Sequence, residues 1–153
     1  MSSPRARLAE LGLTLPSVVP PVAAYVPARR SGSYVYVSGQ LPMVEGVLAR
    51  SGKVGAEVSA DEATDLARIC ALNALAAVDA LVGLDSVTGI VKVLGFVASA
   101  PDFTGQPGVV NGASNLFADV FGAAGQHARS AVGVAVLPLD APVEVELVAE
   151  VGG

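Results

Sequence analysis

The order of strand and helix patterns along the chain is the feature that most restricts its fold. The pattern runs strand, strand, helix, strand, helix, strand, strand. Strict alternation of strands and helices would favour a doubly wound parallel sheet, whereas strand pairs at both ends favour antiparallel pairing. We therefore predict an α+β fold in which two helices pack on one face of a mixed sheet. The other face then needs a cover, for which a second subunit is the obvious candidate.

Two helices are predicted from capping signals and apolar spacing. Ser59 and Glu62 form a capping-box pattern, apolar residues then recur at helical spacing, and Gly83 ends the helix. A second helix is predicted to begin near Pro107, with an apolar stripe that includes Val110, Ala113, Phe117, Val120 and Phe121. A short helix is expected over residues 4–12, ended by Gly12.

The strands are predicted from β-branched and aromatic residues. Tyr34 to Val37 indicate a strand that Ser38-Gly39 should end. A strand from Gly89 carries few charges on either face, which suggests burial on both sides. The remaining expectations are an extended proline-rich segment ahead of the first strand, a hairpin or loop at 43–55, and strands at about 130–137 and 142–150 joined by Pro138 to Ala141.

Composition indicates that the chain associates with itself. Its 153 residues suit a single domain with a substantial core, yet 52% are apolar and only 15% are charged. A lone domain of this size would have difficulty burying that much apolar surface. We therefore expect an oligomer.

Charge and composition also argue against several classes of function. A net charge of −5 with scattered basic residues does not fit a nucleic-acid binder. One histidine and one cysteine make a structural metal site very unfavourable, and Cys70 fits core filling in a helix. No apolar run is long enough to span a membrane, and the charged N-terminus lacks a signal-peptide pattern, so a cytoplasmic location is expected.

The segment HARSAVGVAVLP places a histidine and an arginine at the start of an apolar strand. Arg129 keeps its charge at any working pH and can hold a carboxylate through two parallel hydrogen bonds. The plainer alternative is a strand-end arginine that pairs with a glutamate. His127 could be a general base, but its loop context favours a surface histidine.

The last strand and three further residues supply polar candidates. Glu144 and Glu146 alternate with apolar residues, so both carboxylates should lie on one face, and if both are partly buried their mutual repulsion should raise the pKa of one of them. A wet face on an edge strand is the alternative. Tyr25 and Asn111 could bind a ligand or tie down a loop, whereas Asn73 fits a satisfied core amide.

Taken together, several motifs resemble the Rid (reactive intermediate deaminase) family, also called YjgF. These motifs are YVYVSGQLP, VKVLGFVAS, the Asp102-Phe103 turn, VNGAS, ARSAVGVAVLP and VEVE, in the family's order and spacing. The resemblance covers residues 22–150, which we treat as one domain after an N-terminal extension of residues 1–21. It implies a chorismate-mutase-like fold assembled as a homotrimer with sites in the clefts between subunits.

The resemblance also implies an activity and a set of site residues. Family members hydrolyse reactive enamines and imines such as 2-aminoacrylate to 2-keto acids and ammonia, without a cofactor or metal. By this resemblance Arg129 binds the substrate carboxylate and Glu144 places the attacking water. Tyr25 and Asn111 match family positions, and the SGQ turn at Ser38 and Gly39 borders the cleft, with a backbone group of Ala131 completing the polar lining.

Two positions depart from the family pattern. Ala131 stands where the family commonly has cysteine, and Gly133 stands where its archetype has glutamate. The N-terminal extension and loops resemble a branch labelled endoribonuclease-like. Two other functions therefore stay open: a non-catalytic, regulatory trimer that binds a small anionic metabolite, and a ribonuclease or translation inhibitor, for which an acidic chain is poorly equipped.

Overall fold

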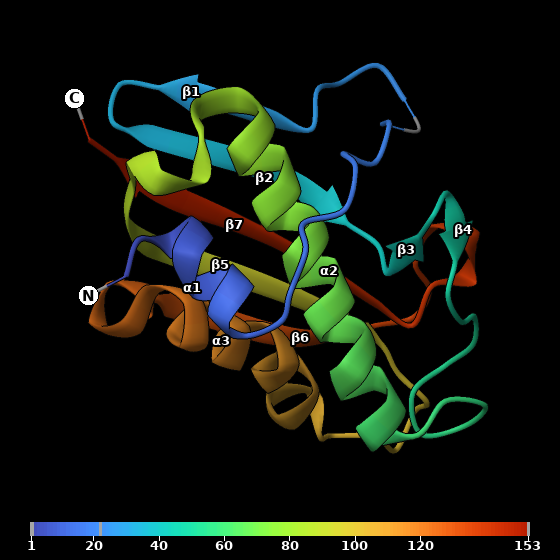
Figure 1. Cartoon of the computed structure of the whole chain (residues 1–153). Coiled ribbons are helices and arrows are strands. Elements are labelled where there is room, and N and C mark those ends of the chain that lie inside the picture. Colours follow the sequence, from blue (N-terminus) through green and yellow to red (C-terminus); the bar gives the residue numbers. More distant parts are fainter. Residues whose placement is uncertain (1, 22, 153) are drawn as a thin grey trace.

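The computed structural model describes residues 2–21 and 23–152 and confirms an α+β fold (Figure 1). One mixed sheet contains five strands in the order β1-β2-β7-β5-β6, and a separate two-stranded hairpin contains β3 and β4. The strands are β1 (Ala28–Ser31), β2 (Tyr34–Gln40), β3 (Met43–Val44), β4 (Val47–Leu48), β5 (Val87–Ala98), β6 (Ala128–Val134) and β7 (Val143–Val151). The α-helices are α1 (Pro4–Glu10), α2 (Ala60–Val82) and α3 (Gln106–Phe121).

The last strand in the sequence lies at the centre of the sheet. β7 pairs antiparallel with β2 on one side and with β5 on the other. β5 and β6 pair in parallel, and α3 makes the crossover between them, as a parallel pair requires. The sequence VEVELVAEV therefore runs between two partners, and its odd positions are buried, while its even positions are partly buried or, at Glu150, exposed.

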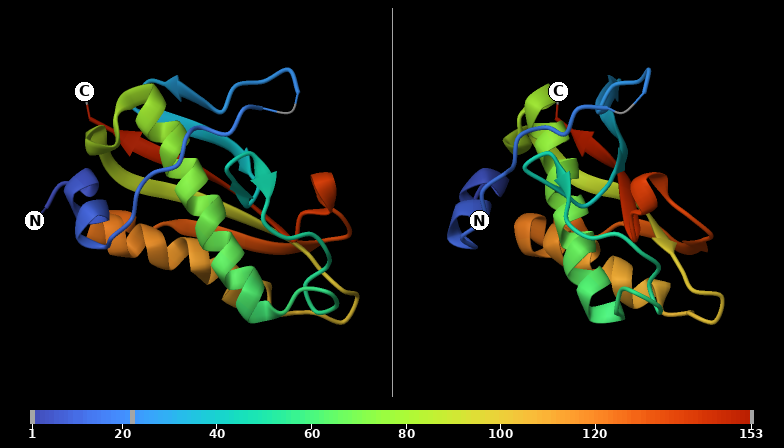
Figure 2. Two further views of the ribbon diagram at one scale, coloured as in Figure 1. Left: turned by 45° about the vertical axis from the view of Figure 1, so that its right-hand side comes forward. Right: turned by 90° about the vertical axis from the view of Figure 1, so that its right-hand side faces the viewer.

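The helices cover one face of the sheet and leave the other open (Figure 2). α2 packs over β2 and β7, while α3 packs over β5 and β6 and against α2. The core between the layers includes fully buried side chains such as Leu75, Val93, Leu116 and Phe117. The predicted layering, with two helices on one sheet face, is thus confirmed, while Pro138 and Leu139 lie beside Glu144 at one end of the opposite face.

Two glycines allow α3 to approach its neighbours closely. A Cβ on Gly112 would lie 1.9 Å from the carbonyl oxygen of Thr64 on α2. A Cβ on Gly95 of β5 would lie 2.4 Å from a methyl group of Val110. Since real carbon atoms cannot approach so closely, only glycine permits this packing at both positions.

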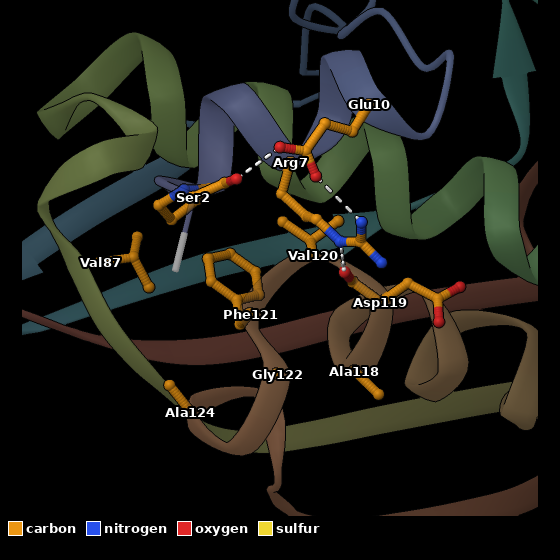
Figure 3. A pocket seen from close by; sticks show the side chains of 11 residues that line it. Ser2, Arg7, Glu10, Val87, Ala118, Asp119, Val120, Phe121, Gly122 and Ala124 are labelled. Atoms are coloured by element: carbon orange, nitrogen blue, oxygen red, sulfur yellow. Dashed lines mark hydrogen bonds and ion pairs between the residues drawn. The ribbon is translucent and has the colours of Figure 1, made fainter.

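The N-terminal segment packs on the main core. Ser3 caps α1, and Leu8 of that helix is 3% exposed. Arg7 donates from Nε to the carbonyl oxygen of Asp119 at 2.9 Å and pairs with Glu10 at 3.0 Å, as Figure 3 shows. A surface groove of about 520 Å³ lies beside these contacts, between α1 and the end of α3.

Most predicted elements are confirmed, and the differences lie at strand boundaries. β1 was not predicted, because a segment with two adjacent arginines is more typical of a loop. β2 does not end at Ser38-Gly39 but continues to Gln40, past an irregularity in its pairing with β7. β6 spans 128–134 rather than 130–137, since its ends are decided by the partner strand β5.

Candidate functional site

Arg129 lies on β6 with its side chain directed toward α3. Its register partner on β5 is Val93, which is fully buried beneath the helices, so Arg129 lies on the helix-covered face. Nη1 donates to Asn111 Oδ1 at 2.7 Å and to Ser114 Oγ at 3.2 Å, and Nη2 donates to the Pro107 carbonyl oxygen at 3.3 Å. One helix therefore holds the guanidinium from one side.

The guanidinium retains hydrogen-bonding capacity for a ligand. Of its five N–H groups, three donate to α3, and the other two have no acceptor among the described residues. Arg129 makes no ion pair with any carboxylate in residues 2–21 and 23–152. The strand-end salt bridge considered for this arginine is therefore absent from this part of the chain, and two donors are the number that one carboxylate accepts from an arginine.

Asn111 and Ala131 lie beside Arg129. Asn111 is exposed on α3 and uses its carbonyl oxygen to accept from the guanidinium, so its amide N–H₂ is directed elsewhere. Ala131 follows Arg129 by two residues on the same face and packs partly against the main core. The structure thus brings together three of the predicted site residues.

His127 is not the solvated loop residue that its sequence context suggested. It is half-buried, and both ring nitrogens have partners: Nδ1 lies 2.6 Å from the Gly125 carbonyl oxygen and Nε2 lies 2.8 Å from Ser114 Oγ. The short helical turn between α3 and β6 folds back far enough to place the ring against α3. The sequence shows no sign of this pairing, because Ser114 and His127 belong to different elements.

Glu144 belongs to a second group of residues, which is separate from the group around Arg129. It lines a pocket of about 370 Å³ with Tyr25 and Gly39. The pocket wall is otherwise largely apolar, and part of it comes from the segment before β1; it includes Val19, Pro20, Pro21, Pro27, Leu41, Met43, Pro138 and Leu139. These wall residues were not predicted as site residues, because proline and valine carry no chemical signature.

The setting of Glu144 changes its protonation. Burial raises the pKa of Glu144 above its ordinary value of 4.5, and the Glu146 carboxylate on the same strand face raises it further. The predicted effect of the Glu144–Glu146 pair on one pKa is thus confirmed, with burial as the larger cause. A Cβ on Gly39 would lie 2.7 Å from the Glu144 carboxyl carbon, so glycine at this position lets the carboxylate lie against the backbone of β2.

Tyr25 and Ser38 are connected through the segment before β1. Ser38 Oγ donates to the Val26 carbonyl oxygen at 2.6 Å, and its backbone N–H donates to the Pro27 carbonyl oxygen at 2.9 Å. These bonds hold the chain next to Tyr25, whose side chain is 45% exposed and lines the Glu144 pocket. In this chain the Ser38 hydroxyl therefore supports the position of Tyr25.

The sheet separates the two groups of residues. Glu144 pairs in register with Phe96, and Phe96 with Val132, so Glu144 faces the open side of the sheet. Arg129 and Ala131 occupy the alternate positions of β6 and face the helices. Within one chain, Arg129 and Glu144 therefore cannot act on the same small molecule.

The other polar candidates are structural. Asn73 is buried on α2 and donates to the carbonyl oxygens of Leu41 and Met43, as predicted for a satisfied core amide. Cys70 is fully buried, and burial raises the pKa of its thiol well above the usual range, so it is a core residue. Among residues 2–21 and 23–152, no three His, Cys, Asp or Glu side chains gather closely enough to hold a metal ion. No helix in the same residues has the length and apolar character needed to cross a bilayer.

Comparison with known proteins supports the assignment from motifs. Residues 5–151 match a family model described as YjgF/chorismate-mutase-like and, provisionally, as endoribonuclease. This chain is a member of the YjgF family. The match begins inside α1, so the YjgF family model includes most of the N-terminal extension.

Relatives in the YjgF family carry different names, among them endoribonuclease, translation initiation inhibitor and protein of unknown function. Protein TCP17 of Trypanosoma cruzi is 44% identical over 147 residues, which cover 95% of this chain and 92% of that protein. The crystal structure of Atu1372 from Agrobacterium tumefaciens, described as of unknown function, is 46% identical, with a TM-score of 0.90 over 99% of this chain and 94% of that one. E. coli TdcF, crystallised with bound serine, is 27% identical, with a TM-score of 0.64 over 88% and 94% of the two chains.

Proposed function

We propose that this protein is an enamine/imine deaminase that hydrolyses small 2-imino acids of the 2-aminoacrylate type to 2-keto acids and ammonia. The observation that carries the proposal is the Arg129 guanidinium, which α3 holds in place while two N–H groups stay open. A group of that shape and charge suits the carboxylate of a small anionic substrate. The related TdcF was crystallised with serine, a small molecule that also bears a carboxylate.

Glu144 supplies the complementary chemistry. A carboxyl group whose pKa is raised toward neutrality can accept a proton from water and return it in a later step. The enamine first takes a proton from solvent at its terminal carbon and becomes a protonated imine. Water then adds to C2 of the protonated imine, the C=N π electrons move to nitrogen, and the water proton passes to Glu144.

The second half of the reaction reverses the role of Glu144. The carboxylic acid returns the proton to nitrogen, the C2–N bond breaks as the C2=O bond forms, the hydroxyl proton is released to solvent, and ammonia leaves. The products are a 2-keto acid and ammonia, and the only co-reactant is water. Such a substrate is already electrophilic, so orientation by a fixed cation and a positioned water provides most of what the reaction needs.

The proposed site requires two copies of the chain. Since the sheet lies between Arg129 and Glu144 in one chain, we propose a homotrimer in which Arg129, Asn111 and Ala131 of one subunit approach Tyr25, Gly39 and Glu144 of the next. The open sheet face, where Tyr36 is 50% exposed and Val132 is 42% exposed, is the surface that such assembly would cover. This arrangement agrees with the apolar excess of the composition.

Mixed trimers test both the activity and the shared site. 2-Aminoacrylate generated by a dehydratase should be hydrolysed by the wild-type protein, whereas Arg129→Ala and Glu144→Gln alone should each lose nearly all activity. Refolded together in equal amounts, the two variants should regain about a quarter of wild-type activity, because three trimers in four are mixed and each mixed trimer holds one intact site. Arg30→Ala, at an exposed position on β1 whose register partner Val35 is buried beneath the helices, is the matched control and should remain active.

Each failure has a separate meaning. If the wild-type protein does not accelerate imine hydrolysis, the deaminase proposal is wrong, and a ligand-binding role becomes the better explanation. If it is active but the mixture stays at background, each site is built within one chain and the shared-site arrangement is wrong. If Arg129→Ala keeps full activity, the carboxylate is held elsewhere.

A further inference from the structure

The only histidine of the chain is held in one tautomer. A carbonyl oxygen can only accept, so the 2.6 Å contact with Gly125 requires the proton on Nδ1 of His127. In the neutral ring, Nε2 then carries a lone pair. The Ser114 hydroxyl, 2.8 Å from Nε2, must donate to it.

This choice of donor and acceptor extends to Arg129. Because the Ser114 proton is directed to His127, the lone pairs of Ser114 Oγ are left for Nη1 of Arg129, which lies 3.2 Å away. The Gly125 carbonyl, His127, Ser114 and Arg129 therefore form one chain of hydrogen bonds with a single consistent direction. With the opposite tautomer, Nε2–H would donate to Ser114 Oγ, but an unprotonated Nδ1 would face the Gly125 carbonyl oxygen and that hydrogen bond would be lost.

Packing fixes the position of the imidazole at one end of this chain of hydrogen bonds. The ring meets the fully buried Phe117 edge-on, with centroids 5.9 Å apart and planes at 85°. Gly125 is buried, and a Cβ there would lie 2.3 Å from the carbonyl oxygen of Phe117. Both the ring and its carbonyl partner are thus held against α3, while Arg129 lies on β6, an edge strand with a single neighbour.

We propose that His127 and Ser114 are positioning residues that hold the Arg129 guanidinium in the orientation that binds a substrate carboxylate. A long side chain on an edge strand otherwise loses rotamer freedom when it binds an anion, and prior ordering removes part of that cost. The inference rests on the proposed role of Arg129 as a carboxylate clamp. It adds a function for the histidine and serine that neither the motifs nor the relatives assign.

Serine removal is the first test. Ser114→Ala should raise KM for the imino acid, and the dissociation constant of the probe 2-oxobutyrate, about tenfold, the order expected from losing one hydrogen bond to a charged group. The kcat should stay within about twofold, because a clamp holds substrate and transition state alike. Asn115→Ala, an exposed neighbour on the same helix, is the matched control and should leave both constants unchanged.

Histidine variants separate positioning from general structural damage. His127→Leu removes the acceptor for Ser114 and should weaken binding as Ser114→Ala does, whereas His127→Gln offers an amide oxygen and should recover most of the affinity. The double variant Ser114→Ala/His127→Leu should be no weaker than either single variant, because both residues act through one contact. The ¹⁵N spectrum of this single histidine should show the proton on Nδ1.

The results distinguish this inference from the proposed function. A wild-type protein that binds 2-oxobutyrate but shows no turnover removes the deaminase activity, and the same binding series still tests the clamp. Unchanged affinity in Ser114→Ala and His127→Leu beside an active wild type overturns the positioning role alone. Additive losses in the double variant, or a proton on Nε2, would also overturn it. If the wild type neither hydrolyses the imino acid nor binds the keto acid, both proposals are wrong.

Discussion

The two faces of the central sheet differ in how closely the rest of the chain packs against them. On the helix-covered face, α3 lies so close to β5 and α2 that glycine is required at Gly95 and Gly112. On the open face, large side chains remain exposed, including Tyr34 at 41% and Tyr36 at 50%. Both faces belong to the same five strands, so the difference comes from which alternate positions carry which side chains.

This contrast explains where the apolar excess of the chain lies. The helix-covered face satisfies its apolar residues within the chain, at close packing and with little tolerance for added volume. The open face carries aromatic and aliphatic residues together with Glu144 and Glu146, a combination suited to contact with another copy around a polar site. The helix-covered face therefore supplies most of the stability of the chain and the open face supplies the proposed contact between subunits, so substitutions on each should have different consequences.

The largest effect is expected on the helix-covered face. Gly112→Ala places a Cβ 1.9 Å from the Thr64 carbonyl oxygen, and backbone cannot yield there without separating α2 from α3. We expect a loss of about 3 kcal/mol or more in the free energy of unfolding, measured by chemical denaturation.

A second glycine on α3 provides the control. A Cβ on Gly108 would have no atom within 4 Å, so Gly108→Ala should be neutral or stabilise by up to about 1 kcal/mol through better helix propensity. Equal destabilisation by both variants would mean that α3 tolerates no alanine in general, and would contradict a specific requirement at the α2–α3 contact.

On the open face, the expected effect is on assembly rather than folding. Val132→Glu places an unpaired carboxylate where a second subunit is proposed to pack, which should weaken association by at least about 100-fold. Light scattering should then report the 15.2 kDa chain instead of a species three times heavier, with an unchanged circular dichroism spectrum.

Val47→Glu is the matched control for assembly. Val47 is 68% exposed on the separate β3–β4 hairpin, and the same substitution there should leave the assembled mass unchanged. A Val132→Glu protein that stays assembled would show that the subunits meet through another surface. A wild-type protein that is already a single chain would refute the proposed trimer.

The smallest effect on stability is expected at Glu144, on the open face. Its raised pKa means that the folded chain binds this proton more tightly than the unfolded chain. The resulting stabilisation is fully present below the ordinary value of 4.5 and is lost as pH rises through the raised pKa. Glu144→Gln should therefore stabilise the fold at pH 7, by up to about 1 kcal/mol after allowance for solvent screening, and by less at pH 4.

Thermal unfolding at the two pH values measures this difference. Glu150→Gln, at an exposed position on the same strand, is the control and should show little change at either pH. A Glu144→Gln protein that is less stable than wild type at pH 7 would contradict the inference that the charged form of Glu144 destabilises the fold. It would indicate instead that the charged form makes a stabilising contact.

Much of the local structure could be predicted from residues close together in the sequence. Ser59 and Gly83 bound α2 because capping depends on the backbone within one turn, and Ser59 Oγ accepts from the Glu62 N–H at 3.1 Å. The carboxylate of Glu62 pairs with Arg50 instead of accepting from the Ser59 N–H, as a complete capping box would require. The residues of the helix alone do not predict this pairing, because Arg50 belongs to the loop before the helix. Alternation along 143–151 placed Glu144 and Glu146 on one face before any fold was known.

Long-range pairing decided the rest. Strand β1 exists because Ala28–Ser31 finds β2 as a partner, although its residues alone favour a loop. The pairing of β7 with β5 determines which side chains lie on the same sheet face as Glu144. The parallel register of β5 and β6 directs Arg129 to the helices. The pairings of β7 and β5 join segments tens of residues apart, which no local pattern encodes, whereas β1 and β2 pair across the two-residue turn at Gly32 and Ser33.

The candidate site divides in the same way. Arg129 and Glu144 could be selected from the sequence, because a guanidinium and a carboxylate on short apolar strands carry recognisable chemistry. Their separation by the sheet, and the pairing of His127 with Ser114, emerged only in the tertiary structure. The physical reason is that side-chain type is a property of each residue, whereas direction and neighbourhood are properties of the packed sheet and helices.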